Sequence, residues 1–157
     1  MPPVKPIPEG HHNLTVYLVV PDADAAIRFY TKAFGAAEVF RMPGPGGKVA
    51  HAELAIGDSR FYLSDEFPDM GGKSPKTLGG TPASLFLWSQ DVDAAWKRAT
   101  EAGAAVKMPL ADMFWGDRFG VVVDPFGQEW QMATHKEDLT PEEMAKRGQA
   151  AMAGMGG

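Results

Sequence analysis

The sequence contains no cysteine. This excludes a disulfide-stapled scaffold, a thiol nucleophile, thiolate-held zinc and an iron–sulfur cluster. The absence is compatible with a reducing compartment, and we expect a cytoplasmic protein. No apolar run approaches the roughly 18 residues of a membrane span, and the start of the chain lacks the apolar stretch of a secretory signal. A membrane-embedded protein is therefore not expected.

Positive charge is also scarce. The chain has 15 Lys and Arg against 20 Asp and Glu, which gives a formal net charge of -5 and a pI near 5.3. An acidic chain is a poor partner for nucleic acid or an anionic membrane, so neither is expected. The 157 residues are 45% hydrophobic and 22% charged, as in a globular domain, or in two small ones that share a core.

The chain contains an internal repeat. A segment that starts at Asp22 resembles one that starts at Asp91, 69 residues later, and the segments run on to Gly35 and Gly103. Each segment has the apolar spacing of a helix, with acidic residues at its start and a glycine where a helix ends. Asp24 and Asp93 serve there as caps or as first-turn acids.

Strand-like stretches surround both predicted helices. They are rich in β-branched and aromatic residues and are bounded by turns that contain glycine or proline. In the first half they cover 14–20, 37–42, 48–56 and 60–64, and in the second half 84–88, 105–108, 119–124 and 128–134. Each half therefore reads β-α-β-β-β.

This pattern divides the chain into five parts. A proline-rich arm covers 1–13, the first βαβββ module 14–64, a linker 65–82, and the second module 83–138. The remaining part, 139–157, begins with Thr140-Pro141-Glu142-Glu143, the pattern of a helix capping box with proline at the first helical position. A terminal helix that frays into the tail is expected there.

Several motifs carry a family resemblance. They are His51-Ala52-Glu53-Leu54, Gly57-Asp58, Leu63–Pro68, Phe114–Arg118, Asp124–Gly127 and Thr134–Asp138. Together with the repeat, they resemble the vicinal oxygen chelate superfamily (glyoxalase, bleomycin resistance protein and dioxygenase), and within it the PhnB-like branch. The resemblance implies an α+β fold in which two tandem βαβββ modules form a cupped, barrel-like mixed sheet with helices outside. It also implies a homodimer.

Enzymes of this superfamily hold a divalent ion with His, Gln or Glu from the first and last strands of each module. The matching positions here are Thr15, Tyr62, Ser84 and Gln131. Hydroxyl groups are poor ligands for a divalent ion, and a single glutamine cannot hold one. The resemblance therefore implies a degenerate metal site, with no metal and no cofactor. We expect the protein to stay folded without a transition metal.

Strand alternation predicts what lines the cup. Apolar residues of one parity, such as Leu18 and Trp130, should pack under the helices, and the opposite parity should point into the cup. The predicted ligand-binding residues are Tyr17, Arg60, Tyr62, Trp88, Trp115, Arg118, Glu129 and Gln131. The competing interpretation is that these aromatics only fill the interior and that Arg118 pairs with Asp117. For Phe86 alone, we expect packing in the interior.

His51 and Glu53 are the candidate catalytic residues. Two apart on one strand, they can form a dyad in which the carboxylate orients an imidazole that acts as a general base. They can also be half of a displaced metal site, or an inert polar pair. His11 and His12 lie in the arm and are interpreted as an incidental surface pair.

Two functions remain open from the sequence. The first is a protein that binds a small planar or amphipathic molecule in an aromatic cup. The alternative is an enzyme of the isomerase, lyase or dioxygenase class that uses His51 and Glu53.

Overall fold

The first half of the chain forms one sheet with one helix. In a computed structural model, which describes residues 1–155, the strands are β1 (Val16–Val20), β2 (Ala37–Pro43), β3 (Val49–Ile56) and β4 (Ser59–Asp65). The first sheet has the order β1-β4-β3-β2, with β1 parallel to β4 and the other neighbours antiparallel. Helix α1 (Ala23–Phe34) connects β1 to β2.

The second half repeats this arrangement. Its strands are β5 (Ser84–Trp88), β6 (Ala105–Asp112), β7 (Asp117–Val123) and β8 (Glu129–His135), and α3 (Val92–Ala102) follows β5. The second sheet has the order β5-β8-β7-β6, with β5 parallel to β8. The α+β class and the β-α-β-β-β order of both halves, predicted from the repeat, are confirmed. The two sheets are not closed into a barrel.

The helix starts follow the repeat and decide between the two roles that the sequence left open for Asp24 and Asp93. Asp22 and Asp91 are the N-caps of α1 and α3, and each carboxylate accepts a hydrogen bond from the backbone three residues on. Asp24 and Asp93 are first-turn acids and not caps. Gly35 ends α1 with a φ of 67°. This left-handed conformation is less favourable for a residue with a side chain than for glycine.

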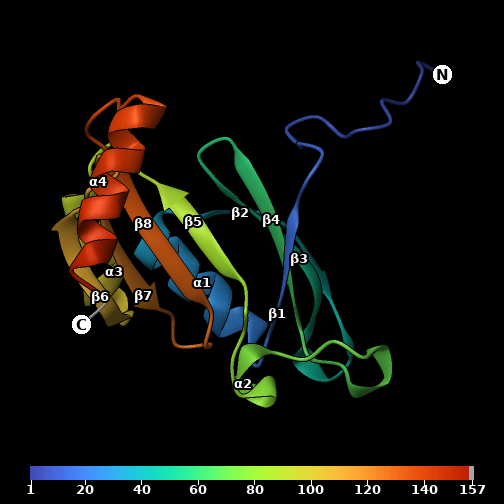
Figure 1. Cartoon of the computed structure of the whole chain (residues 1–157). Helices are drawn as coiled ribbons and strands as arrows, with labels where there is room; N and C mark the ends of the chain where they lie inside the picture. Colours follow the sequence, from blue (N-terminus) through green and yellow to red (C-terminus); the bar gives the residue numbers. More distant parts are fainter. Residues whose placement is uncertain (156–157) are drawn as a thin grey trace.

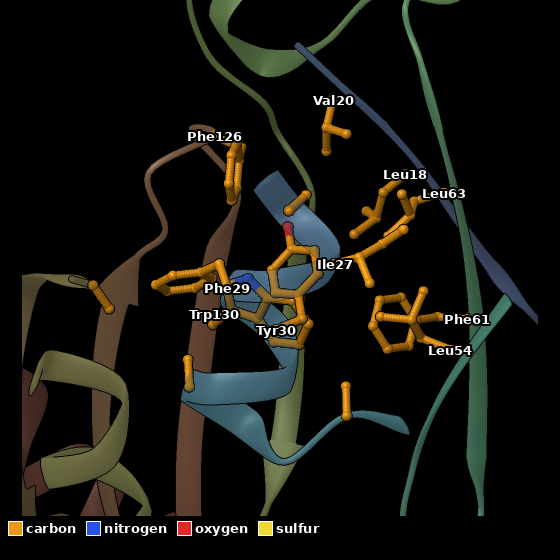
Figure 2. Packing of buried hydrophobic residues seen from close by; sticks show 14 of the residues in the cluster. Leu18, Val20, Ile27, Phe29, Tyr30, Leu54, Phe61, Leu63, Phe126 and Trp130 are labelled. Atoms are coloured by element: carbon orange, nitrogen blue, oxygen red, sulfur yellow. The ribbon is translucent and has the colours of Figure 1, made fainter. Parts of the chain in front are cut away.

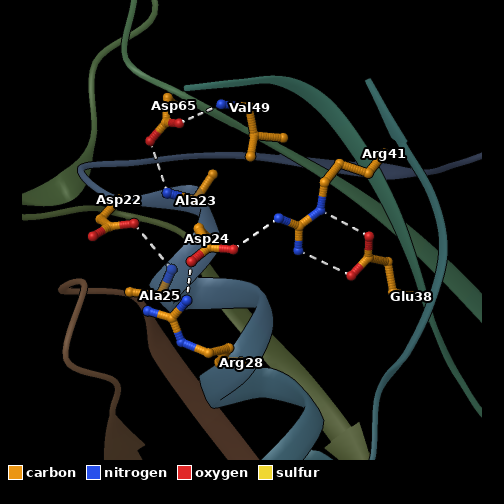
Figure 3. A network of polar contacts seen from close by, with 9 residues as sticks. All are labelled: Asp22, Ala23, Asp24, Ala25, Arg28, Glu38, Arg41, Val49 and Asp65. Atoms are coloured by element: carbon orange, nitrogen blue, oxygen red, sulfur yellow. Dashed lines mark hydrogen bonds and ion pairs between the residues drawn. The ribbon is translucent and has the colours of Figure 1, made fainter. Parts of the chain in front are cut away.

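In each module, one side chain near the end of the strand that runs parallel to the first strand accepts a hydrogen bond from the first N–H of the helix. In the first module the Asp65 carboxylate accepts from Ala23 N and from Val49 N, both at 2.7 Å (Figure 3). In the second module the hydroxyl of Thr134 takes this place and accepts from Val92 N at 2.8 Å. Both modules thus have the same link between strand and helix, called the joint here. A carboxylate makes it in the first module and a hydroxyl in the second.

The core lies between the two sheets, around α1. Figure 2 shows Tyr30 of α1 with Phe61 of the first sheet on one side and Trp130 of the second on the other. The ring centroids of Tyr30 lie 5.8 Å from Phe61 and 5.4 Å from Trp130, and Phe61 lies 6.2 Å from Trp130. Helices α1 and α3 also pack on each other. Each sheet therefore turns one face toward α1 and α3 and the other, called the open face, away from them. On the open face of the second sheet, Phe119, Val121 and Ala133 are nevertheless buried in a small cluster.

Short elements complete the chain (Figure 1). They are the 3-10 turns η1 (Pro45–Gly47) and η2 (Pro68–Met70), the short helix α2 (Pro75–Leu78), and α4 (Pro141–Ala153). The predicted capping box of α4 is present, with Thr140 and Glu143 each bonding the other's backbone. Part of the predicted tail, 156–157, lies outside the described residues. Within residues 1–155, no helix is long and apolar enough to cross a membrane.

Candidate functional site

The open face of the first sheet carries a cluster of aromatic and titratable side chains. Tyr17 of β1, His51 and Glu53 of β3, and Tyr62 of β4 have the strand parity that points away from α1. The Tyr17 hydroxyl lies 3.1 Å from His51 Nδ1, and the His51 ring lies 5.0 Å from the Tyr62 ring. The predicted alternation therefore brings these four residues together.

His51 and Glu53 are neighbours but not a hydrogen-bonded dyad. His51 Nε2 lies 3.6 Å from Glu53 Oε1, which is longer than a hydrogen bond. The hydrogen bond of His51 goes instead to Tyr17. The phenol, rather than the carboxylate, therefore orients this imidazole.

The arm brings one further residue to this face. His11 packs on Tyr62 with ring centroids 5.8 Å apart, and only 11% of its side chain is exposed. Its Nδ1 lies 3.2 Å from the Glu9 carbonyl oxygen, and its buried Nε2 has no hydrogen-bond partner and lies 3.9 Å from Glu53 Oε2. The interpretation of His11 as an incidental surface residue is wrong, while His12 is exposed. Spacing in the sequence could not show that the arm folds back over the sheet.

The open face of the second sheet is mainly aromatic. Phe86 lies 4.7 Å from Trp88 and 5.9 Å from Phe119, and Trp115 from the preceding turn lies 5.3 Å from Phe119, all between ring centroids. Trp88 and Phe86 are 57% and 44% exposed. Gln131 has the same parity as this cluster, because Trp130 on its neighbouring position faces the core. The expectation that Phe86 only fills the interior is therefore wrong for the single chain.

Glu129, the first residue of β8, lies on the same face and is hydrogen-bonded to its neighbours. Its carboxylate accepts from the Lys107 ammonium and, at 3.0 Å, from the Ser84 hydroxyl. The hydrogen bond from Lys107 lowers the pKa of Glu129 below its ordinary value. This carboxylate is already paired with a cation.

Arg118 does not lie on the open face. Its guanidinium binds the Asp93 carboxylate of α3 at 2.8 to 3.0 Å and also reaches Asp112 at 3.3 Å. It shares its parity on β7 with Gly120, which lies against Trp96 of α3. Arg118 is therefore part of an ion pair on the helix side of the sheet, as the competing interpretation held, but with a different partner. Asp117 instead contacts His135 at 2.8 Å.

Within one chain, the predicted ligand-binding residues do not share one cup. Helices α1 and α3 lie between the two sheets, so the two open faces point away from each other (Figures 1 and 2). A cleft of about 500 Å³ between the β3–β4 turn and β5 does bring together Arg60, Phe86 and Trp88. Predicted ligand-binding residues of both modules meet in this cleft.

The positions expected for a metal do not fit one. Tyr62 lies on the open face of the first sheet, while Ser84 and Gln131 lie on the second, and Ser84 is engaged by Glu129. In the part of the chain that the structure describes, no group of three or more His, Cys, Asp or Glu is placed to hold a metal ion. Hydroxyl and amide groups are poor ligands for a divalent ion, and within one chain they lie on two separate faces.

Comparisons with known proteins agree with this architecture. The sequence pattern of the Glyoxalase/Bleomycin resistance protein/Dioxygenase superfamily matches residues 11–132. The uncharacterized protein Rv0887c of Mycobacterium tuberculosis is 48% identical over 146 residues, which are 91% of this chain and 84% of that one. The crystal structure of TioX from Micromonospora sp. ML1 has a TM-score of 0.65 and 29% identity, covering 79% of this chain and 98% of TioX. The PhnB protein from Bacillus cereus shares the fold, with a TM-score of 0.63 at 21% identity over 78% of this chain and 99% of that one.

Proposed function

Because the chain belongs to the glyoxalase/bleomycin resistance protein/dioxygenase superfamily, we propose that it binds a small planar or amphipathic molecule without a metal ion. The observation that carries this proposal is the pair of open faces, where large aromatic side chains remain exposed: Tyr17 at 49%, Phe86 at 44% and Trp88 at 57%. Large apolar side chains gathered on one face mark a surface that a ligand or another chain covers. As part of this proposal we take the protein to act in the cytoplasm, which the cysteine-free sequence allows.

The proposal includes a homodimer. The polar open face of the first sheet and the aromatic open face of the second cannot meet within one chain, so a second copy supplies the opposite wall of each cup. Two copies related by a two-fold axis then make two equivalent cups. A dimer of this kind buries upward of about 2,000 Å² in total.

Light scattering coupled to size exclusion tests the dimer. We expect twice the 16.9 kDa of one chain, and we expect Phe86→Arg to give the single-chain mass because it places a charge on the covered face. Leu78→Arg is the matched control, since Leu78 is 62% exposed on α2 and belongs to neither sheet. A single-chain mass for the wild type at all concentrations would rule out the shared cup.

A thermal-shift screen of planar metabolites and antibiotics tests the binding function. A ligand at 100 times its dissociation constant adds about 2.7 kcal/mol to the stability, which is a readily measured shift. The enzyme alternative rests on His51, because its Tyr17 contact at 3.1 Å fixes an imidazole on an accessible face. A binding protein returns its ligand unchanged, whereas an enzyme that uses His51 as a base converts the ligand, and His51→Ala abolishes the conversion.

A further inference from the structure

We infer that Arg60 binds the oxyanion of a small acid, a carboxylate or a phosphate group, in a pocket between the N-terminal arm and the β3–β4 turn. This pocket, called the arm pocket here, has a volume of about 390 Å³. It is lined by Gly10, His11 and His12 of the arm and by Gly57, Asp58 and Arg60 of the first sheet. The inference goes beyond the proposed function and does not rest on it.

A guanidinium without a partner is the observation that carries the inference. Of the six arginines of the chain, five contact acceptors on the protein. The acceptors are carboxylates for Arg28, Arg41, Arg118 and Arg147, and carbonyl oxygens of α1 for Arg98. Among residues 1–155, Arg60 alone makes neither an ion pair nor a hydrogen bond to the protein, although it is partly buried. An anion that reaches this cation supplies the missing partner.

The arm holds the guanidinium in position. The backbone of Gly10 comes so close that a Cβ there would lie 3.0 Å from Arg60 Nη2 and 3.3 Å from Nε. Gly10 has a φ of 78°, which favours glycine, and His11 N bonds the Pro8 carbonyl oxygen beside it. The side chain is therefore placed before a ligand arrives, and less conformational entropy is lost when the ligand binds.

The groups around the arm pocket favour an anion. The guanidinium keeps its charge at any ordinary pH, and its fork of N–H donors matches two oxygens of a carboxylate or a phosphate. The exposed His12 has at least one ring N–H in either protonation state and adds a donor. Asp58, the acidic residue of this lining, accepts from the Ser59 hydroxyl at 3.3 Å and forms no ion pair with Arg60.

The arm pocket adjoins the cleft of about 500 Å³ that contains Phe86 and Trp88, because Gly57, Asp58 and Arg60 line both. A molecule larger than the arm pocket therefore has room to extend beyond it while its acidic group stays at Arg60. The chemical class of the ligand is then a small carboxylic acid or a phosphate ester.

Other occupants fit less well. A metal ion or an organic cation would meet the positive charge of Arg60, and the described residues present no group of three His, Asp or Glu that could hold a metal. A neutral flat molecule can stack on the guanidinium, but it leaves the N–H donors without acceptors. A carboxylate of a second copy of the chain is the remaining alternative, and the experiment below separates it from a small acid.

Titration of the ¹⁵N-labelled full chain, followed by NMR, tests the site. The probes are sodium phosphate and, separately, sodium acetate, at constant ionic strength and about pH 7. We expect saturable shifts of the amide resonances of Gly10, Gly57 and Arg60 with at least one of the two anions. Arg60→Gln should weaken the binding about tenfold or more, because it removes the hydrogen bonds to a charged group. Arg28→Gln removes the same charge from an exposed arginine of α1 and, as the matched control, should leave the binding unchanged.

Three results would overturn the inference. The first is the absence of saturable shifts with both anions. The second is binding that persists unchanged in Arg60→Gln, or that weakens equally in Arg28→Gln. The third is a dimer that gives the single-chain mass in Arg60→Gln, because Arg60 then pairs with a carboxylate of the second copy.

Failure of this inference is distinguishable from failure of the proposed function. A thermal-shift screen without a hit removes the proposed function and leaves the anion site standing if phosphate or acetate binds at Arg60. A planar ligand that binds equally well to wild type and Arg60→Gln, in a protein that shows no anion binding, keeps the proposed function and removes the anion site. Melting curves of the variants establish that they are folded.

Discussion

The Tyr30 hydroxyl donates a 2.6 Å hydrogen bond to the Asp124 carboxylate, which lies 94 residues further along the chain. The same carboxylate oxygen accepts from Trp130 Nε1 at 2.9 Å, and its second oxygen accepts from the backbone N–H groups of Phe126 and Gln128. Burial, and then the negative charge of Asp124, raise the pKa of Tyr30 well above its ordinary value. Asp124 thus joins α1 of the first module to the β7–β8 turn of the second.

Removing this hydrogen bond should destabilise the whole chain. We expect Tyr30→Phe to lower the free energy of unfolding by about 1.5 to 3 kcal/mol, the range for a bond to a charged group. Asp124→Ala should cost more, about 3 kcal/mol or above, because it leaves the buried Tyr30 and Trp130 donors unpaired. Urea denaturation measures both. Tyr17→Phe, on the open face, is the control and should change stability by less than about 0.5 kcal/mol.

The joint at Asp65 gives a second prediction. Asp65→Ala leaves the N–H groups of Ala23 and Val49 without their acceptor, so we expect a loss of about 2 to 5 kcal/mol in unfolding free energy. Asp69→Ala removes an exposed carboxylate from the linker and should cost little. Equal stability of the two variants would contradict the role assigned to this joint.

Two glycines differ in the space around them and give a matched pair of predictions. A Cβ on Gly120 would lie 2.6 Å from the Trp96 ring and 3.1 Å from the Met108 carbonyl oxygen, so Gly120→Ala should destabilise by about 1 to 3 kcal/mol through overpacking. A Cβ on Gly148 in α4 meets its nearest neighbour, the Phe114 ring, at 3.4 Å. Gly148→Ala should therefore be neutral or stabilise by up to about 1 kcal/mol, through helix propensity. Thermal melts that rank the two the other way would count against the packing of α3 on β7.

His135 gives a prediction about pH. Its hydrogen bond to Asp117, and then the one to Asp138, raise its pKa above the ordinary 6.5. Since the folded state holds the proton more tightly, the stabilisation is complete below the unfolded pKa and disappears as pH rises through the folded pKa. Melting temperatures between about pH 5.5 and 8.5 should therefore fall less steeply in His135→Gln than in the wild type. If the melting temperatures of the two proteins change with pH in parallel, the His135 imidazolium contributes nothing to stability.

The repeat and the strand alternation were readable in the sequence because each depends on local periodicity. Two-residue alternation placed Leu18 and Trp130 under the helices and Tyr17 and Tyr62 on the open side, as observed. The parity of Arg118 was missed, because β7 begins at Asp117, two residues before the predicted strand, and the side chain reaches across to α3.

The site itself was harder to predict, because its assembly depends on contacts that periodicity does not encode. A βαβββ pattern does not say whether the two sheets face each other or turn their helices inward, and this choice decides whether Tyr62 and Gln131 share a cup. His11 gives no signal in a proline-rich arm. Its position on Tyr62 depends on how the arm turns at Pro8 and Gly10, where His11 N bonds the Pro8 carbonyl oxygen.

The inward packing of the two sheets also has a consequence for communication across the molecule. Tyr62 and Gln131 lie on outward faces, yet the residues directly before them, Phe61 and Trp130, contact each other in the core. We therefore expect a shift of β4 at one face to reach β8 at the other through these two rings. In the proposed dimer each copy lines both cups, so occupancy of one cup bears on the affinity of the other. Cooperativity, measured as a Hill coefficient that departs from one, is the expected signature.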